Sequence, residues 1–147
     1  MAFSWSRRVA NLAMAAALLA LGALNGCGSS GEPLVPVEGQ VQFEGKPLTK
    51  GTVILFADAD KKNDTKHEPR GVIGPDGRYK IVTHPDDGAP AGWYKVGVVV
   101  VQPSDPKNPY SEPRSLIPVK FGKPAESKLF IEVRKDAPPK SYDLELR

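Results

Sequence analysis

The feature that most constrains this chain is a valine-rich run at Trp93–Gln102, which Gly92 and Pro103 bracket. Valine is stiff at χ1 and packs well on a pleated surface, so the run predicts a β-strand near the centre of a sheet. Successive side chains of a strand point to opposite faces. The residues expected on the inner face are Tyr94, Val96, Val98 and Val100. Because this face must be covered, the other strands are expected to pack around it.

The opposite face of the same strand carries Lys95, which indicates solvent, and then Val99 and Val101. Two exposed valines on an unpaired strand would favour aggregation. We therefore expect the proline-rich segment 103–123, or a partner protein, to cover that end of the strand.

The rest of the chain from Val35 onward shows the two-residue period of strands and no helical period. The 147 residues are enough for one ordinary domain, and 15 prolines and 14 glycines favour short strands joined by many turns. Strands are expected at 37–43, 52–57, 71–73, 78–83, 128–134 and 142–146. Turns or loops are expected at 44–48, 58–68, 74–77, 85–90 and 137–140. This pattern predicts an all-β, antiparallel β-sandwich.

The first 26 residues have the pattern of an export signal. Arg7 and Arg8 precede an apolar stretch, 9–24, that is shorter than the roughly 20 residues a membrane-spanning helix needs. The stretch ends at Leu24-Asn25-Gly26-Cys27, which resembles the bacterial lipobox, although asparagine is less usual at that place in the motif. In lipoproteins that carry the motif, the signal is cut before the cysteine and the thiol carries diacylglycerol.

This pattern predicts a lipoprotein signal peptide at 1–26, an acylated Cys27 with a flexible tether at 27–34, and a sandwich domain at 35–147. The expected location is the cell envelope, on the periplasmic or outer-membrane face, and Gly28 after the cysteine favours the outer membrane. A plain membrane anchor or an ordinary secretory signal is the alternative, and Ser6-Arg7-Arg8 also suggests twin-arginine export. With a single cysteine, the chain forms no internal disulfide and no cysteine-built metal site.

Several turns and core positions resemble one family. The segments Val37–Val41, Gly45–Leu48, Gly74–Tyr79, Ala91–Val96 and Leu116–Pro118 resemble carboxypeptidase regulatory-like, or transthyretin-like, domains. The likeness covers about Val35 to Leu146 and is closest to the version found in small bacterial lipoproteins, especially of planctomycetes. It implies a Greek-key β-sandwich of seven to eight strands. These motifs are specific for fold and nearly silent on activity.

The charge distribution gives little support for nucleic-acid binding. The chain has 20 basic and 17 acidic residues, a net charge of +3, and two of the basic residues, Arg7 and Arg8, lie in the expected signal peptide. No basic run is interleaved with aromatic residues. Nucleic acid is therefore not expected among the partners.

Catalytic motifs are not evident in the sequence. Its only histidines, His67 and His84, fall in expected loops outside any HxH or HxxxH pattern, and we expect both to be solvated. The chain ends Asp143–Arg147 and lacks the Tyr-Arg-Gly-Ser tail of the transthyretin-related hydrolases. No nucleophile elbow or phosphate loop is present. We expect a non-catalytic protein without a cofactor, and a hydrolase is the least favoured hypothesis for its function.

Two loops offer an alternative function as a calcium- or carbohydrate-binding module. The first, 58–64, carries four side chains with the oxygen ligands that calcium prefers: Asp58, Asp60, Asn63 and Asp64. It lacks the EF-hand register, and Lys61 and Lys62 would repel a cation, so a solvated loop is favoured. The second, 86–93, ends at Trp93, which is able to stack on a sugar but is expected to serve in packing. The expected partners are the membrane, through Cys27, and an envelope protein or polysaccharide.

Overall fold

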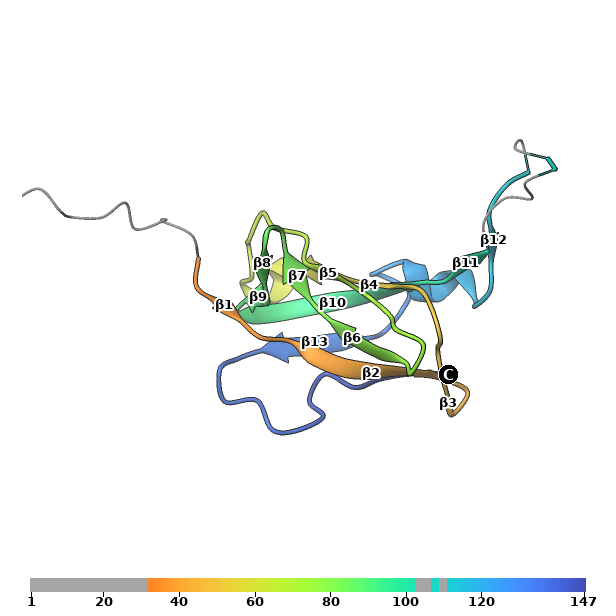
Figure 1. Cartoon of the computed structure of the whole chain (residues 1–147). Coiled ribbons are helices and arrows are strands. Elements are labelled where there is room, and N and C mark those ends of the chain that lie inside the picture. The colour runs from red at the N-terminus through yellow and green to blue at the C-terminus, as the bar shows by residue number, and fades with distance from the viewer. Residues whose placement is uncertain (1–31, 103–106, 109–110) are drawn as a thin grey trace, which may run out of the picture. The chain divides into compact units, whose positions relative to one another are not determined.

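The computed structural model describes residues 32–102, 107–108 and 111–147, and Figure 1 shows that they form a unit built of strands. This confirms the predicted all-β class. In the described part of the chain, the helical elements are two short 3₁₀ turns, η1 (Ala59–Lys61) and η2 (Val119–Gly122), and no helix is long and apolar enough to cross a membrane. The predicted signal peptide and Cys27 lie outside the described residues.

The larger sheet is built around β10 (Gly92–Val99), which corresponds to most of the predicted valine strand. Antiparallel neighbours flank β10 on both sides, β13 (Phe130–Val133) on one and β4 (Thr52–Ala57) on the other. The sheet then continues through β5 (Arg70–Val72), β7 (Val82–Thr83) and β8 (Asp86–Asp87). The valine run is therefore central, as its composition predicts.

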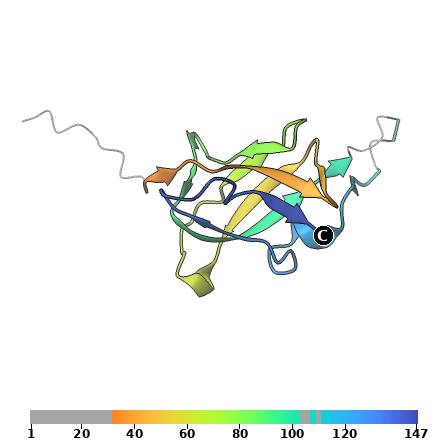
Figure 2. The same ribbon diagram turned by 90° about the horizontal axis from the view of Figure 1, so that it is seen from below.

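The second sheet is built around β2 (Glu38–Phe43), which pairs with β3 (Lys46–Pro47), β6 (Arg78–Lys80) and β14 (Leu144–Leu146). The β14–β2 pair is parallel, whereas the other described pairs are antiparallel, so the antiparallel prediction is wrong for the last strand. The residues between β13 and β14 carry the chain across to the second sheet and supply the longer connection that parallel pairing needs. Figure 2 shows β2 and β14 running side by side.

Two short strand pairs complete the described fold. The strand β1 (Leu34–Val35) pairs with β9 (Ala89–Pro90), and β11 (Val101–Gln102) pairs with β12 (Arg114–Ser115). Figure 1 places these pairs at opposite ends of the domain. The described unit begins at Glu32, where Thr65 Oγ1 donates a hydrogen bond to Glu32 Oε2 at 3.1 Å, and β1 begins at Leu34, the last residue of the predicted tether.

The core is the space between the inner faces of the two sheets. All four predicted inner residues of the valine run, Tyr94 to Val100, are at most 2% exposed. The second sheet covers them with residues that the two-residue period also assigned inward. These include Val37, Val41, Tyr79, Ile81, Leu144 and Leu146. The alternation of apolar residues therefore predicts the buried face of both sheets.

The outer end of the valine run is covered only in part. The strand breaks at Val100, and η2 packs against β10, with Gly122 beside the Val99 side chain. Val99 is half-buried, but Val101 remains 46% exposed and pairs through its backbone with Ser115. Among the described residues, cover by segment 103–123 is confirmed for Val99, whereas Val101 is left partly open, and cover by a partner protein stays a prediction.

One backbone carbonyl, that of Tyr142, joins β2 and β6 to the segment before β14. The Tyr79 hydroxyl donates a hydrogen bond to this oxygen at 2.5 Å, and Gly39 lies so close that a Cβ there would collide with it. The Tyr142 side chain continues the junction, because its hydroxyl lies 3.3 Å from both the backbone nitrogen and the carbonyl oxygen of Arg134.

We predict that Gly39→Ala lowers the free energy of unfolding by about 1–3 kcal/mol, because the new methyl group forces the β2 and Tyr142 backbones apart. Urea denaturation measures the change. Gly45→Ala is the control, since Gly45 has φ +77° and no atom near an added Cβ, and its loss is about 1 kcal/mol from backbone strain alone. A smaller loss at Gly39 than at Gly45 would contradict the close approach.

We predict that stability falls as the pH rises above about 10, the ordinary tyrosine pKa. Burial, and then the charge of Asp143, raise the pKa of Tyr79, and burial also raises the pKa of Tyr94. Both groups therefore stay protonated in the folded chain while they ionise in the unfolded one, so their contribution is complete below pH 10 and declines above it. Urea midpoints at increasing alkaline pH measure the decline. In Tyr79→Phe the decline is shallower, and an equally steep decline would contradict the assignment.

Candidate binding groove

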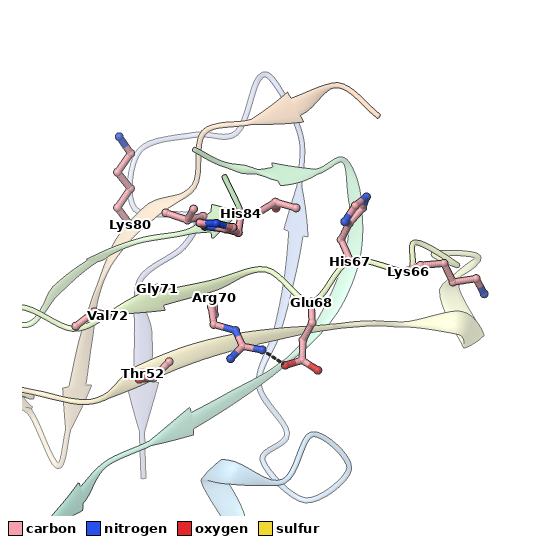
Figure 3. Close-up of a pocket in the computed structure, with 11 residues that line it drawn as sticks. Thr52, Lys66, His67, Glu68, Arg70, Gly71, Val72, Lys80 and His84 are labelled. Carbon is pink, nitrogen blue, oxygen red and sulfur yellow. Dashed lines mark hydrogen bonds and ion pairs between the residues drawn. The ribbon is translucent and has the colours of Figure 1, made fainter. Parts of the chain in front are cut away.

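A hollow of about 970 Å³ lies against β4, β5 and β7 (Figure 3). Its walls come from three stretches of chain: β4, the segment through β5, and β7 with the residues beside it. The lining residues are Thr52, Lys66, His67, Glu68, Arg70, Gly71, Val72, Lys80, Val82, Thr83 and His84. The sequence prediction treated the two histidines as separate loop residues, whereas the fold brings both exposed rings to one groove.

The groove lies beside a hairpin whose strands pair with both sheets. The strand β5 pairs with β7 at one register position only, Arg70 with Val82, while β6 leaves to pair with β2. At Gly71 the backbones of β5 and β6 are so close that a Cβ would collide with the Lys80 carbonyl, so a glycine is required there. The next residue, Val72, has little cover and is 76% exposed at the margin of the hollow.

Ion pairs hold two of the cationic side chains of the groove. Arg70 Nη2 lies 2.7 Å from Glu68 Oε1, and Lys80 Nζ lies 2.6 Å from Asp87 Oδ2. The hydrogen bond to Asp87 raises the pKa of Lys80 above its ordinary value. Lys66 forms no ion pair with the residues that the structure describes. Among the described residues, the groove therefore combines two ion-paired cations, Arg70 and Lys80, with the unpaired Lys66 and the two imidazole rings.

The hydroxyl of Thr83 serves the fold. It is buried and donates a hydrogen bond to the Gly88 carbonyl at 2.7 Å, which ties β7 to the turn after β8. Since that proton is already used, the hydroxyl is not aimed at a ligand.

The predicted calcium residues lie in a loop that is less open than expected. Asp58 is 2% exposed, and Lys95 Nζ lies 3.2 Å from Asp58 Oδ1 and 3.0 Å from Asp60 Oδ2. The hydrogen bond to Asp60, and then the contact with the Asp58 carboxylate, raise the pKa of Lys95. The ammonium occupies the position between the two carboxylates that a cation would take, so a calcium ion would have to displace it.

The remaining residues of this loop are engaged with the start of β10. The Asn63 side chain is buried. Its Nδ2 donates a hydrogen bond to the Trp93 carbonyl at 2.8 Å, and its Oδ1 accepts one from the Thr65 backbone N–H at 3.3 Å. The Trp93 ring is half-buried, with Lys61 Nζ 4.0 Å from its centroid. Asp64 is exposed. The prediction of a solvated loop is therefore wrong for Asp58 and Asn63, which are buried because they anchor the loop to β10.

The predicted loop 86–93 is also more ordered than the sequence suggests. Asp86 and Asp87 form β8, which pairs with β7, and Ala89 and Pro90 form β9, which pairs with β1. Gly88, with φ +105°, makes the turn between them and packs against the Val35 carbonyl. Trp93 belongs to β10 and is spatially joined to the Asp58 loop, as the cation–π contact and the Asn63 hydrogen bond show.

Within the described residues, no group of three or more histidine, cysteine, aspartate or glutamate side chains has an arrangement that would hold a metal ion. The groove was missed at the level of sequence because its parts lie at 52, 66–72 and 80–84 and no periodic pattern links them. Only the short predicted strand at 71–73, which contains Val72, pointed locally to this part of the chain.

Comparison with known proteins identifies no relative: no protein-family model, no curated protein and no solved structure matches this chain.

We predict that Lys95→Met lowers the melting temperature, because the buried Asp58 carboxylate loses its ionic partner. Asp60→Asn removes the exposed partner of the same lysine and is expected to cost clearly less. Thermal unfolding with and without millimolar calcium measures both effects. In the wild-type protein calcium leaves the melting temperature unchanged, and a rise in calcium would instead support the ion site at Asp58 and Asp60.

Proposed function

We propose that the protein is a non-catalytic, lipid-anchored binding domain of the bacterial cell envelope, and that the groove between β5 and β7 is its binding site. The observation that carries the binding role is the groove itself, in which exposed rings and cations gather from three stretches of chain. Ion pairs to Glu68 and Asp87 restrain Arg70 and Lys80 before any ligand arrives, which lowers the cost of binding.

The anchor rests on the amino-terminal pattern, in which Arg7 and Arg8, an apolar stretch and Cys27 follow in the order of a lipoprotein signal. The described residues begin at Glu32, five positions after Cys27. Five extended residues reach at most about 18 Å. An acylated Cys27 would therefore hold the β1 end of the domain close to the membrane, with the β11–β12 pair at the opposite end.

The geometry supports the groove over the two predicted loops as the binding site. In the first loop Lys95 neutralises the carboxylates that would receive a calcium ion. At the end of the second, the Lys61 ammonium lies over the Trp93 ring that would receive a sugar. Among the residues that the structure describes, none occupies the groove in a comparable way. The partner expected there is an envelope polysaccharide or protein.

We predict that the protein isolated from bacterial membranes carries acyl chains on Cys27 and lacks residues 1–26. Intact-mass analysis and metabolic labelling with palmitate measure both features. Cys27→Ser is the matched control and is expected to lose the label and to keep the signal segment. Wild-type protein with an unmodified Cys27, or with Arg7 and Arg8 retained, would contradict the anchor and leave the groove to be tested separately.

A further inference from the structure

A second hollow, of about 820 Å³, adjoins the groove and shares Val72 and Lys80 with it. Its walls come from the outer faces of β2 and β6 and from the segment before β14. The lining residues are Glu38, Gly39, Gln40, Gln42, Val72, Gly74, Arg78, Tyr79, Lys80, Lys140 and Asp143. The two hollows, which meet at the β5–β6 hairpin that pairs with both sheets, are together termed the depression.

The charged side chains that line the depression include more basic than acidic residues, which favours an anionic ligand. The basic ones are Lys66, Arg70, Arg78, Lys80 and Lys140, and the acidic ones are Glu38, Glu68 and Asp143. Lys66 in the first hollow and Lys140 in the second form no ion pair within the described part of the chain. Between them, Lys80 is shared by both hollows, and its partners are Asp87 at 2.6 Å and Glu38 at 3.9 Å. Two unpaired ammonium groups in separate hollows would suit a ligand with well-spaced negative charges.

The walls also carry groups that would bind hydroxyls. The carboxylates of Glu38 and Glu68 and the amide oxygen of Gln42 would accept hydrogen bonds from a hydroxyl-rich chain. The same carboxylates would repel the densely charged backbone of a nucleic acid or a polyphosphate. A sparsely charged polymer that is rich in hydroxyl groups satisfies both sets of side chains.

A peptide that adds a strand to a sheet is less well suited to the depression. Strand addition needs a free strand edge. Here β5 pairs with β4 and, at Arg70, with β7, while β6 pairs with β2 and is bridged to the other sheet through Ile73 and Tyr79. Recognition would therefore use side chains, as is usual for a polysaccharide.

We propose that the two hollows form a single elongated site for an acidic polysaccharide, with Lys66 and Lys140 binding carboxylate groups and Val72 lying beneath the chain at the junction. This inference rests on the proposed binding role of the groove and names its ligand class.

The experiment measures binding of the full-length protein in detergent to immobilised polygalacturonate, with neutral dextran and polyphosphate as comparison probes. We expect saturable binding to polygalacturonate that weakens as salt is added, and little binding to dextran. Lys66→Gln and Lys140→Gln each weaken binding about two- to fivefold at low ionic strength, and the double variant weakens it further. Lys62→Gln is the matched control, because Lys62 is exposed, has positive φ as Lys140 does, and lines neither hollow.

A second pair of variants tests the junction. Val72→Glu places a carboxylate where the hollows meet and is expected to weaken binding about tenfold or more through like-charge repulsion. Val119→Glu makes the same change at a valine that is 63% exposed on η2, outside both hollows, and is expected to leave affinity unchanged. Unchanged urea midpoints in all variants show that the fold is intact.

The outcomes separate the ligand class from the binding role. Equal losses in Val72→Glu and Val119→Glu, or in Lys66→Gln and Lys62→Gln, would overturn the elongated site. Dextran binding that Val72→Glu abolishes would overturn the acidic ligand while supporting the groove as a binding site. Preference for polyphosphate would likewise overturn the polysaccharide class, and binding to none of the probes would overturn the inference and leave the membrane anchor unaffected.

Discussion

Four side chains on one face of the central strand, Tyr94, Val96, Val98 and Val100, are almost completely removed from water, and both sheets are arranged to cover them. Full burial of each such side chain contributes about 1.5–3 kcal/mol. The neighbouring strands β4 and β13 supply backbone partners for β10, and the inner faces of β2 and β14 supply the opposite wall of the core. The tyrosine hydroxyl at the end of this row donates to the Pro90 carbonyl at 2.9 Å, so burial leaves it paired.

The two sheets that cover this strand are joined through the hairpin of β5 and β6. The hairpin of β5 and β6 belongs to both sheets, because β5 pairs with β4 and β6 pairs with β2. Close packing at Gly71 and the bridge between Ile73 and Tyr79 keep the two strands together. The candidate groove and the adjoining hollow both border this hairpin, since Val72 and Lys80 line both. The side chains of the two hollows come from segments that are distant in the chain.

The elements that sequence reasoning predicted well are those with a local signal. The bounds of β4 agree with the prediction at both ends, and the glycine-containing turn at 74–77 forms where expected. The predictions that needed correction depend on distant partners. Asp58 is buried because Lys95 and the start of β10 lie against it, and β14 is parallel to β2 because of the crossover that precedes it. Neither partner is visible in the neighbouring residues.

The sequence by itself determined that the chain is all-β and which residues face the core, and it predicts an export and lipidation signal before the domain. These conclusions follow from the period of apolar side chains and from short contiguous motifs, both of which act over a few residues. Only the tertiary structure decided that His67 and His84 share a groove, that Lys95 neutralises the Asp58 loop, and that two hollows join at Val72. Those arrangements arise from register and strand crossing between distant segments, which alternation along one strand does not specify.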